Sequence, residues 1–315
     1  MSKNILIIGG TRFFGKLLVQ SLLDAAHQVT IATRGQAIDH FGKQVKRIKV
    51  DRRDAAAMQE AFRSIDGYDI VYDQMCYSPL DAAISAQVFA DKVGRYVMAS
   101  TIEVYQHLQG VIEHPFLESD LELGVLPVEL DRPWHTPEFA ERFYGLGKRQ
   151  AEAYFYQDGG LPLVSVRIGH VLAGPQDFTE RLAHYVKLAA SRKPLQHSVC
   201  LGKSSFTNPV AISDFLFWVG EQSFSGAVNS ACGGELSALD IFQRTCTLMQ
   251  MEAATLPVVA PRQASVLSPF DYPSAYMMNT DKATALGYRF NHRKDWLDDL
   301  IRQHVATMAT AESNF

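Results

Sequence analysis

The stretch that decides the fold of this chain reads Asn4-Ile5-Leu6-Ile7-Ile8-Gly9-Gly10-Thr11-Arg12-Phe13-Phe14-Gly15. An apolar strand runs directly into a glycine-rich turn, and the residues that follow have the amphipathic pattern of a helix. A strand, a glycine turn and a helix N-terminus form a site for a dinucleotide pyrophosphate, because the first N–H groups of a helix are unpaired and partly positive. The predicted cofactor-binding residues of this loop are Gly9, Gly10, Thr11, Arg12, Phe13, Phe14 and Gly15.

The alternation of apolar strands and amphipathic helices continues through the first half of the chain. Strands are expected at 4–8, 28–33, 45–50, 69–73, 95–100 and 162–168, and helices at 16–26, 54–63, 81–92 and 139–156. Such alternation produces a parallel sheet with helices on both faces, whose ligands lie at the carboxyl ends of the strands. The predicted fold class is therefore α/β, with a Rossmann-type doubly wound parallel sheet in residues 1–170.

The second half of the chain is more mixed and predicts a smaller C-terminal α+β substrate lobe in residues 171–315. Helices are expected near 178–191, 212–222, 238–250 and 295–309, separated by short segments rich in Pro and Gly. A segment around 205–231 is expected to return to the first domain. Residues 106–138 lack a clear period, and they could form a cover over the substrate or a plain surface excursion.

Composition excludes several classes of function. The formal net charge is −4, whereas nucleic-acid binding usually needs a basic surface, so we expect a small-molecule substrate and no nucleic acid. The apolar run 5–8 is too short for a signal peptide and no apolar stretch is long enough to span a membrane, which predicts a cytoplasmic protein. The scattered cysteines predict buried free thiols and no metal; they are Cys76, Cys200, Cys232 and Cys246.

The end of the second predicted strand, Thr33-Arg34-Gly35, bears on which dinucleotide binds. NAD-binding folds commonly have an acid here for the adenine ribose, whereas an arginine accommodates a 2′-phosphate. Arg12 stands where such loops usually have their middle glycine, and Arg12 and Arg34 could hold one phosphate between them. The sequence therefore favours NADP; the alternatives are NAD and two solvated surface arginines.

Further cofactor contacts are predicted after the third and fourth strands. Asp51 closes the third strand, and it could accept a hydrogen bond from the adenine amino group or belong to the N-cap region of the next helix. Asp73, Gln74 and Met75 follow the fourth strand. We expect them to line the ribose and the pyrophosphate, mainly through their backbone.

Tyr144 and Lys148 are four residues apart in a predicted helix and therefore share one of its faces. A phenol has a pKa of roughly 10, and an adjacent ammonium group favours the phenolate and lowers that pKa. Such a pair suits a proton relay to a carbonyl or hydroxyl group, and Lys148 could also bind the nicotinamide ribose. Gly145 and Gly147 weaken this helix, so something other than helix propensity must hold it.

The fifth predicted strand ends in Ala99-Ser100-Thr101-Ile102-Glu103. The hydroxyl of Thr101 lies where it could polarise a substrate oxygen. Glu103 could act as an acid or base, or it could be a solvated carboxylate with no role in the chemistry.

Taken in order, these motifs resemble the extended short-chain dehydrogenase/reductase superfamily, in its NAD-dependent epimerase/dehydratase branch. The resemblance covers most of the chain and includes the glycine loop, Asp51, Ser100-Thr101, the Tyr–Lys pair and Val166-Arg167-Ile168-Gly169. It implies that Thr101, Tyr144 and Lys148 are the catalytic residues, and we count Ser100 and Arg167 with the cofactor site. The expected function is an NADP(H)-dependent oxidoreductase or epimerase acting on a secondary alcohol or carbonyl of a sugar-like substrate.

The sequence also departs from that branch. The glycine loop, residues 68–73 and Pro269-Phe270-Asp271 resemble an atypical branch that contains chloroplast stem-loop binding proteins, which bind RNA and have lost the catalytic tyrosine. This chain retains Tyr144, but Ile102 stands where nucleotide-sugar dehydratases have an acid. The alternative function is therefore a nucleotide-sensing or RNA-binding protein without redox turnover. Relatives often form homodimers, and the apolar segment 153–156 could serve such a contact or the core.

Overall fold

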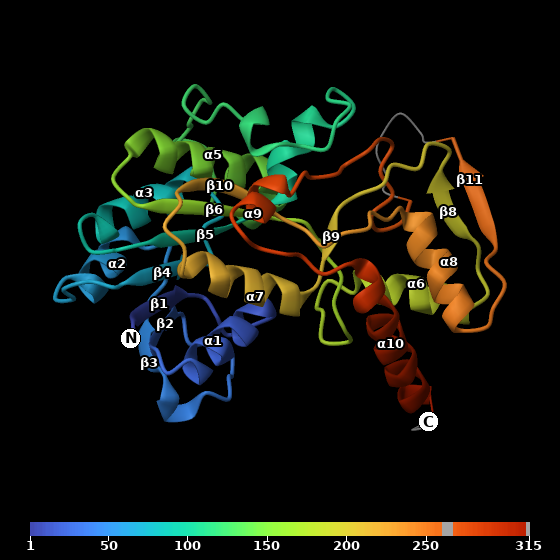
Figure 1. The fold of residues 1–315 in the computed structure, drawn as a ribbon, viewed down its shortest axis with the longest axis horizontal. Helices are drawn as coiled ribbons and strands as arrows, with labels where there is room; N and C mark the ends of the chain where they lie inside the picture. The colour runs from blue at the N-terminus through green and yellow to red at the C-terminus, as the bar shows by residue number, and fades with distance from the viewer. Residues whose placement is uncertain (260–266, 313–315) are drawn as a thin grey trace. The chain divides into compact units, whose positions relative to one another are not determined.

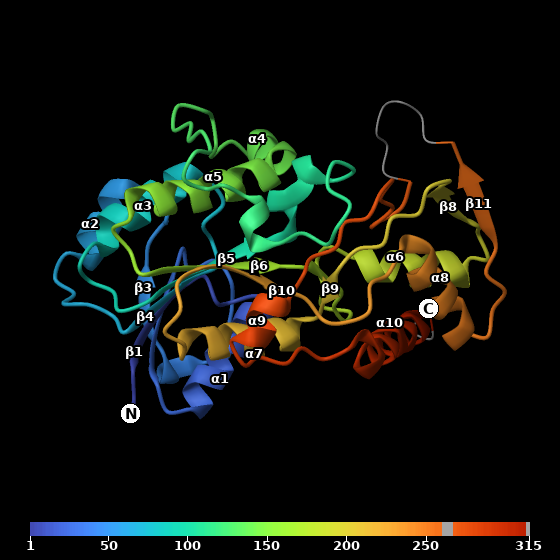
Figure 2. The same ribbon diagram turned by 45° about the horizontal axis from the view of Figure 1, so that its top comes forward.

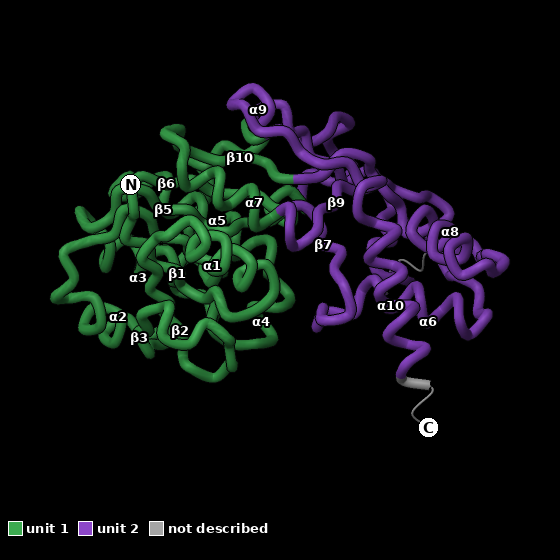
Figure 3. Tube along the Cα trace, turned by 60° about the horizontal axis from the view of Figure 1, so that its bottom comes forward, with its two compact units in different colours: residues 1–106, 118–168, 212–230 green, residues 107–117, 169–211, 231–315 purple. Residues whose placement is uncertain are grey.

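The computed structural model describes residues 1–259 and 267–312. The chain forms two compact units, each with its own internal contacts (Figure 3). Unit 1 consists of residues 1–106, 118–168 and 212–230, and unit 2 of residues 107–117, 169–211 and 231–315. That unit 2 binds the substrate remains a prediction.

Unit 1 is built on a seven-stranded sheet whose strands are all parallel, in the order β10-β6-β5-β4-β1-β2-β3. The chain runs from β1 to β2 and β3 on one side and then crosses to β4 on the other, so the switch point where ligands bind lies between β1 and β4. This confirms the predicted fold class. The strands are β1 (Asn4–Ile8), β2 (Gln28–Thr33), β3 (Lys46–Lys49), β4 (Ile70–Asp73), β5 (Tyr96–Thr101), β6 (Leu163–Ile168) and β10 (Gly226–Ser230).

Helices cover both faces of this sheet, which is why its central strands are apolar runs. Helices α2 (Ala55–Phe62), α3 (Pro79–Phe89) and α5 (Tyr144–Asp158) lie on one face, and α1 (Phe14–Asp24) and α7 (Pro209–Gly220) lie on the other (Figure 1). Figure 2 shows α3 and α5 side by side over the sheet. Every residue of β4, β5 and β6 is buried.

The predicted helix over 139–156 is wrong in one respect, because the structure has two helices there. Helix α4 (Pro137–Arg142) ends before Phe143, whose φ of −113° and ψ of 28° are not helical, and α5 then begins at Tyr144. The glycines at 145 and 147 lower the helix propensity at this point, so a break costs little. As a result, Tyr144 is the first residue of α5 rather than an interior one.

Unit 2 contains its own apolar core between α6 (Arg181–Ala190), α8 (Ala238–Leu248) and α10 (Leu297–Glu312). It also has the short helix α9 (Asp281–Ala285) and two pairs of parallel strands. These pairs are β7 (His170–Val171) with β9 (Phe206–Thr207), and β8 (Leu195–Ser198) with β11 (Thr255–Val258). Within residues 1–259 and 267–312, none of the helices has the length and apolar character needed to cross a bilayer.

The cysteines are free thiols, and their burial differs from the prediction at one position. Cys76, Cys232 and Cys246 are buried, whereas Cys200 is exposed. Cys200 lies in a bend two residues beyond the end of β8.

Candidate active site

The turn between β1 and α1 requires glycine. Gly9 and Gly10 have φ angles of +104° and +82°, which residues with a Cβ rarely adopt. A Cβ on Gly15 would lie 2.9 Å from the Cα of Gly10 and would overlap the Gln74 side chain. In this described turn no side chain caps α1, and no acidic residue lies in its first turn. The bare backbone and the uncapped helix N-terminus are the arrangement that suits a pyrophosphate.

Gln74 supplies a second sign of a ligand at this turn. Its Nε2 atom is buried, and among the described residues it has no hydrogen-bond partner. Leaving a buried amide donor unpaired costs about 1–3 kcal/mol, which a polar ligand would relieve. Phe13 adds local strain, because its φ of 52° and ψ of −139° are rare for a residue with a large side chain, and such strain concentrates at ligand sites. The residues present at this turn therefore fit a dinucleotide.

Two of the predicted cofactor residues, Arg12 and Arg34, are exposed. Across the part of the chain that the structure describes, neither side chain has an ion pair or a side-chain hydrogen bond. Lys49, which the sequence reading missed, is paired in register with Thr33 on the neighbouring strand, and its aliphatic chain lies 3.6 Å from the position that a Cβ on Gly35 would take. A lysine beside the end of β2 therefore adds a cation near Arg34.

Asp51 lies next to the start of α2 but does not cap it. Asp54, not Asp51, is the N-cap of α2, and its carboxylate accepts a hydrogen bond of 3.0 Å from the N–H of Ala57. Asp51 is exposed, and its Oδ1 accepts a hydrogen bond of 3.0 Å from the N–H of Arg53. Its contact with an adenine amino group stays a prediction.

The carboxylate of Asp73 has its partners in the protein interior. It is fully buried and bonds the guanidinium of Arg52, while the hydroxyl of Tyr96 donates to its Oδ2 over 2.6 Å. Its other oxygen, Oδ1, accepts a hydrogen bond of 2.8 Å from the N–H of Met75. Asp73 therefore fixes the loop after β4 from the buried side. The groups of this loop that can contact a cofactor are the loop backbone and the side chains of Gln74 and Met75.

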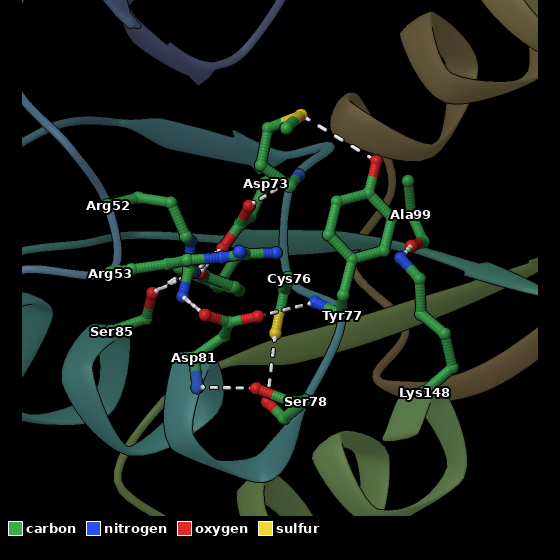
Figure 4. Close-up of polar contacts among 12 residues, drawn as sticks. Arg52, Arg53, Asp73, Cys76, Tyr77, Ser78, Asp81, Ser85, Ala99 and Lys148 are labelled. Carbon is green, nitrogen blue, oxygen red and sulfur yellow. Dashed lines mark hydrogen bonds and ion pairs between the residues drawn. The ribbon is translucent and has the colours of Figure 1, made fainter. Parts of the chain in front are cut away.

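Arg52 is the centre of a buried ionic cluster that the sequence reading also missed (Figure 4). Its guanidinium bonds Asp73, lies 3.0 Å from a carboxylate oxygen of Asp81, and donates to Ser85 over 2.9 Å. Burial opposes the ionisation of both Arg52 and Asp81. The charge of Arg52 nevertheless holds the pKa of Asp81 well below its usual value, and the carboxylates of Asp73 and Asp81 raise the pKa of Arg52. Asp81 in turn accepts a hydrogen bond of 2.8 Å from the N–H of Tyr77.

The predicted catalytic lysine is almost fully buried. Lys148 is 2% exposed, and its Nζ donates a hydrogen bond of 2.6 Å to the carbonyl oxygen of Ala99 on β5. Nζ also lies 4.4 Å from the centre of the Tyr77 ring, over its face (Figure 4). Burial lowers the pKa of this ammonium group. The amine is thereby held at the carboxyl end of the sheet.

Tyr144 and Thr101 lie on the two elements that meet at this end. Tyr144 is 37% exposed, and its ring centre lies 6.1 Å from that of Tyr77. Thr101 ends β5, is buried, and accepts a hydrogen bond of 3.3 Å at its hydroxyl oxygen from the N–H of Glu103. The structure thus places all three predicted catalytic residues in unit 1, on α5 and β5.

The glycines of α5 permit its close approach to neighbouring backbone. A Cβ on Gly147 would overlap the carbonyl oxygen of Tyr77 and lie 3.3 Å from the Trp134 ring, and a Cβ on Gly145 would overlap the carbonyl oxygen of Glu103. Packing against these carbonyls, rather than helix propensity, holds this part of α5 in place.

Gly147→Ala should destabilise the protein although alanine favours a helix. The added methyl group meets backbone that cannot rotate away, and overpacking of this kind costs about 1–3 kcal/mol. Chemical denaturation measures the change. An equal or higher stability of the variant would contradict the close approach of α5 to the loop at Tyr77.

Ser100 and Arg167, predicted to bind the cofactor, belong to a second buried cluster. Arg167 is fully buried and donates to both oxygens of Glu152 and, over 2.7 Å, to the hydroxyl of Tyr105. The hydroxyl of Ser100 donates to Glu152 as well. Both side chains are therefore occupied by partners inside unit 1, and neither belongs to the proposed cofactor contacts.

Comparison with known proteins places these features in context. A family model described as the NAD dependent epimerase/dehydratase family matches residues 5–201. A curated relative, the chloroplast stem-loop binding protein of 41 kDa b from Arabidopsis thaliana, is 37% identical over 84 residues. That match covers 22% of this chain and 22% of the relative, so the chain spans about a fifth of that relative's length.

Solved structures similar to this chain share its fold over nearly its whole length. UDP-glucose 4-epimerase from Thermotoga maritima has a TM-score of 0.72 at 14% identity, with 97% of this chain and 99% of that chain covered. dTDP-glucose 4,6-dehydratase from Bacillus anthracis in complex with NAD has a TM-score of 0.71 at 14% identity, with 97% of each chain covered. UDP-glucose 4-epimerase from Thermus thermophilus in complex with NAD has a TM-score of 0.69 at 18% identity, with 95% and 98% covered.

Proposed function

The chain belongs to the NAD dependent epimerase/dehydratase family, and from that premise we propose that it is an NADP(H)-dependent oxidoreductase or epimerase acting on a secondary alcohol or carbonyl. The observation that carries this proposal is the placement of Tyr144 and Lys148 on one face of α5, with the lysine amine held at the carboxyl end of β5. The same unit contains the glycine cradle and the unpaired Gln74 amide. Both halves of a redox site are therefore available within one unit.

The cofactor would be held by the backbone of residues 9–15, by Gln74 and Met75, and by the cations Arg12, Arg34 and Lys49. When bound, the nicotinamide supplies or accepts the hydride. Asp51 is available at the end of β3 for the adenine, as it is exposed. The amine of Lys148 is held in place, because it donates a short hydrogen bond to the carbonyl oxygen of Ala99.

The residues of the chain supply the proton chemistry. Tyr144 exchanges a proton with the substrate oxygen, as acid when a carbonyl is reduced and as base when an alcohol is oxidised. The Lys148 ammonium favours the phenolate form of Tyr144 by its charge. Thr101 donates its hydroxyl hydrogen to the same substrate oxygen, since its oxygen already accepts from the N–H of Glu103.

Titration of the purified protein with NADPH and NADH, followed by turnover of a panel of carbonyl compounds and sugar nucleotides, tests this function. Sugar nucleotides are included because similar structures are named as epimerases and dehydratases of UDP- and dTDP-glucose. An epimerase changes the substrate and leaves the cofactor level constant, whereas a reductase consumes NADPH. Binding of stem-loop RNA without any cofactor-dependent turnover would contradict the proposal.

Arg34→Ala should weaken NADPH binding by roughly ten- to a hundredfold and change NADH binding by less than about threefold. The variant loses a charge-assisted hydrogen bond to the 2′-phosphate, which NADH does not have. Fluorescence titration with both nucleotides measures the ratio. Arg63→Ala, which removes an arginine whose partner is the exposed Glu60 on α2, is the matched control. An equal loss for both nucleotides would show that Arg34 does not read the phosphate.

A further inference from the structure

The loop after β4 brings a second tyrosine, Tyr77, against both predicted catalytic side chains of α5. The centre of its ring lies 4.4 Å from the Nζ of Lys148, which is over the ring face, and 6.1 Å from the ring centre of Tyr144. Tyr77 comes from a different element than the Tyr–Lys pair and stands 67 positions before Tyr144 in the chain. Spacing along the helix therefore gives no sign of it.

We propose that Tyr77 is a positioning residue that holds the buried Lys148 ammonium in its charged form and at a fixed place. This inference rests on the proposed function, in which Lys148 acts on Tyr144. The face of an aromatic ring is partly negative and attracts a cation, most strongly where water is excluded. Among the described residues, the Ala99 carbonyl and the Tyr77 ring are the partners of Lys148 that replace the lost water.

Tyr77 is held by two contacts of its backbone and one of its hydroxyl group. Its backbone N–H donates to Asp81 over 2.8 Å, and its carbonyl oxygen packs where Gly147 has no side chain. Its hydroxyl group lies 3.7 Å from the sulfur of Met75. Asp81 is itself held by Arg52 and by His135. With its backbone fixed and its hydroxyl group at Met75, the ring is placed over Nζ, where it can restrict the amine.

The other charged and titratable groups around the amine act in both directions. Burial and the charge of Arg52 lower the pKa of Lys148. Three neighbours raise it: Cys76, Asp73 and Asp81. An ammonium group has three N–H donors. One is used by Ala99 and the ring face covers the amine on another side, which leaves donor capacity for a ligand hydroxyl or for Tyr144. Loss of the ring would remove a favourable partner of the cation and let the amine deprotonate at lower pH.

NMR titration of protein labelled with [ε-13C]lysine tests this without any turnover, with the Lys148 signal identified by its absence in Lys148→Arg. We expect Tyr77→Leu to move the titration midpoint of Lys148 to lower pH, and Tyr77→Phe, which keeps the ring, to leave it near the wild-type value. Tyr156→Leu, the same change at an exposed tyrosine of α5, is the matched control. Should Tyr77→Leu not fold, Tyr77→Met serves with the same expectation.

A wild-type midpoint in Tyr77→Leu would overturn the proposal, and so would an equal shift in Tyr77→Phe, since the hydroxyl rather than the ring would then matter. Turnover adds a second readout: we expect kcat to fall about tenfold in Tyr77→Leu, with the KM for NADPH within about threefold. Failure of the proposed function is recognised separately. In that case the wild-type protein neither binds nicotinamide nucleotides nor turns over any substrate, whatever the Lys148 titration shows.

Discussion

Tyr144→Phe should lower kcat by a factor of about 10²–10⁴ and leave NADPH binding within about threefold. The substitution removes one oxygen atom, and with it the group that exchanges a proton with the substrate; general acid–base catalysis contributes an effect of this size. Tyr144 is the first residue of α5, and its phenol is partly exposed, so the hydroxyl can reach a substrate without rearrangement of the core.

The measurement combines steady-state turnover on the substrate found in the panel with fluorescence titration of NADPH. Tyr156→Phe is the matched control, because Tyr156 lies on the same helix and is 60% exposed. That control should turn over at the wild-type rate. A Tyr144→Phe variant with wild-type kcat would show that the proton is carried by another group, and a variant that no longer binds NADPH would assign the tyrosine to the cofactor instead.

The fold could be predicted from the sequence because parallel strands buried on both faces read as short apolar runs. All the strands expected in the first 170 residues are present, with ends that agree to within one residue. The strand β10 (Gly226–Ser230) could not be predicted in the same way. Its residues Asn229 and Ser230 are polar, yet buried, and Asn229 is satisfied by Glu118 and Tyr105 from distant parts of the chain.

The candidate site shows the same limit more sharply. The spacing of Tyr144 and Lys148 predicts a shared helix face, which depends only on helix geometry. The partners of the lysine, Ala99 and Tyr77, come from other elements, and no local pattern announces them. Likewise, nothing in the sequence around Arg167 indicates that its guanidinium forms a buried ion pair with Glu152.

Arg52 and Arg53 illustrate why the burial of a charged side chain could not be predicted from the sequence. They are adjacent and chemically identical, yet Arg52 is 6% exposed and Arg53 is exposed. The difference arises only because β4 ends in Asp73 and because Asp81, in the first turn of α3, faces the same interior point. A buried ion cluster therefore becomes visible only when all of its members are placed in space.

Arg52→Met should lower the free energy of unfolding by about 3–5 kcal/mol at pH 7, because it leaves two buried carboxylates without their cation. Both Asp73 and Asp81 are fully buried, so water cannot replace the guanidinium. Urea denaturation measures the loss. Arg53→Met is the matched control; the only side-chain bond of Arg53 among the described residues is a 3.3 Å contact with the carbonyl of His135, so we expect less than about 0.5 kcal/mol.

The pH dependence of the stability lost in Arg52→Met shows whether Arg52 stabilises the protein by its charge or by packing of its aliphatic part. In the wild type, Arg52 keeps the pKa of Asp81 below its unfolded value, so the ionised carboxylate contributes stability above pH 4 or so, and that contribution is lost as the pH falls further. In Arg52→Met burial still opposes ionisation of Asp81 but its main opposing cation is gone, so protonation of Asp81 relieves the variant. The gap between variant and wild type should therefore narrow as the pH is lowered from 7 toward 4. A gap that stays constant over this range would mean that the aliphatic part of Arg52 stabilises the protein by packing, and that its charge contributes little.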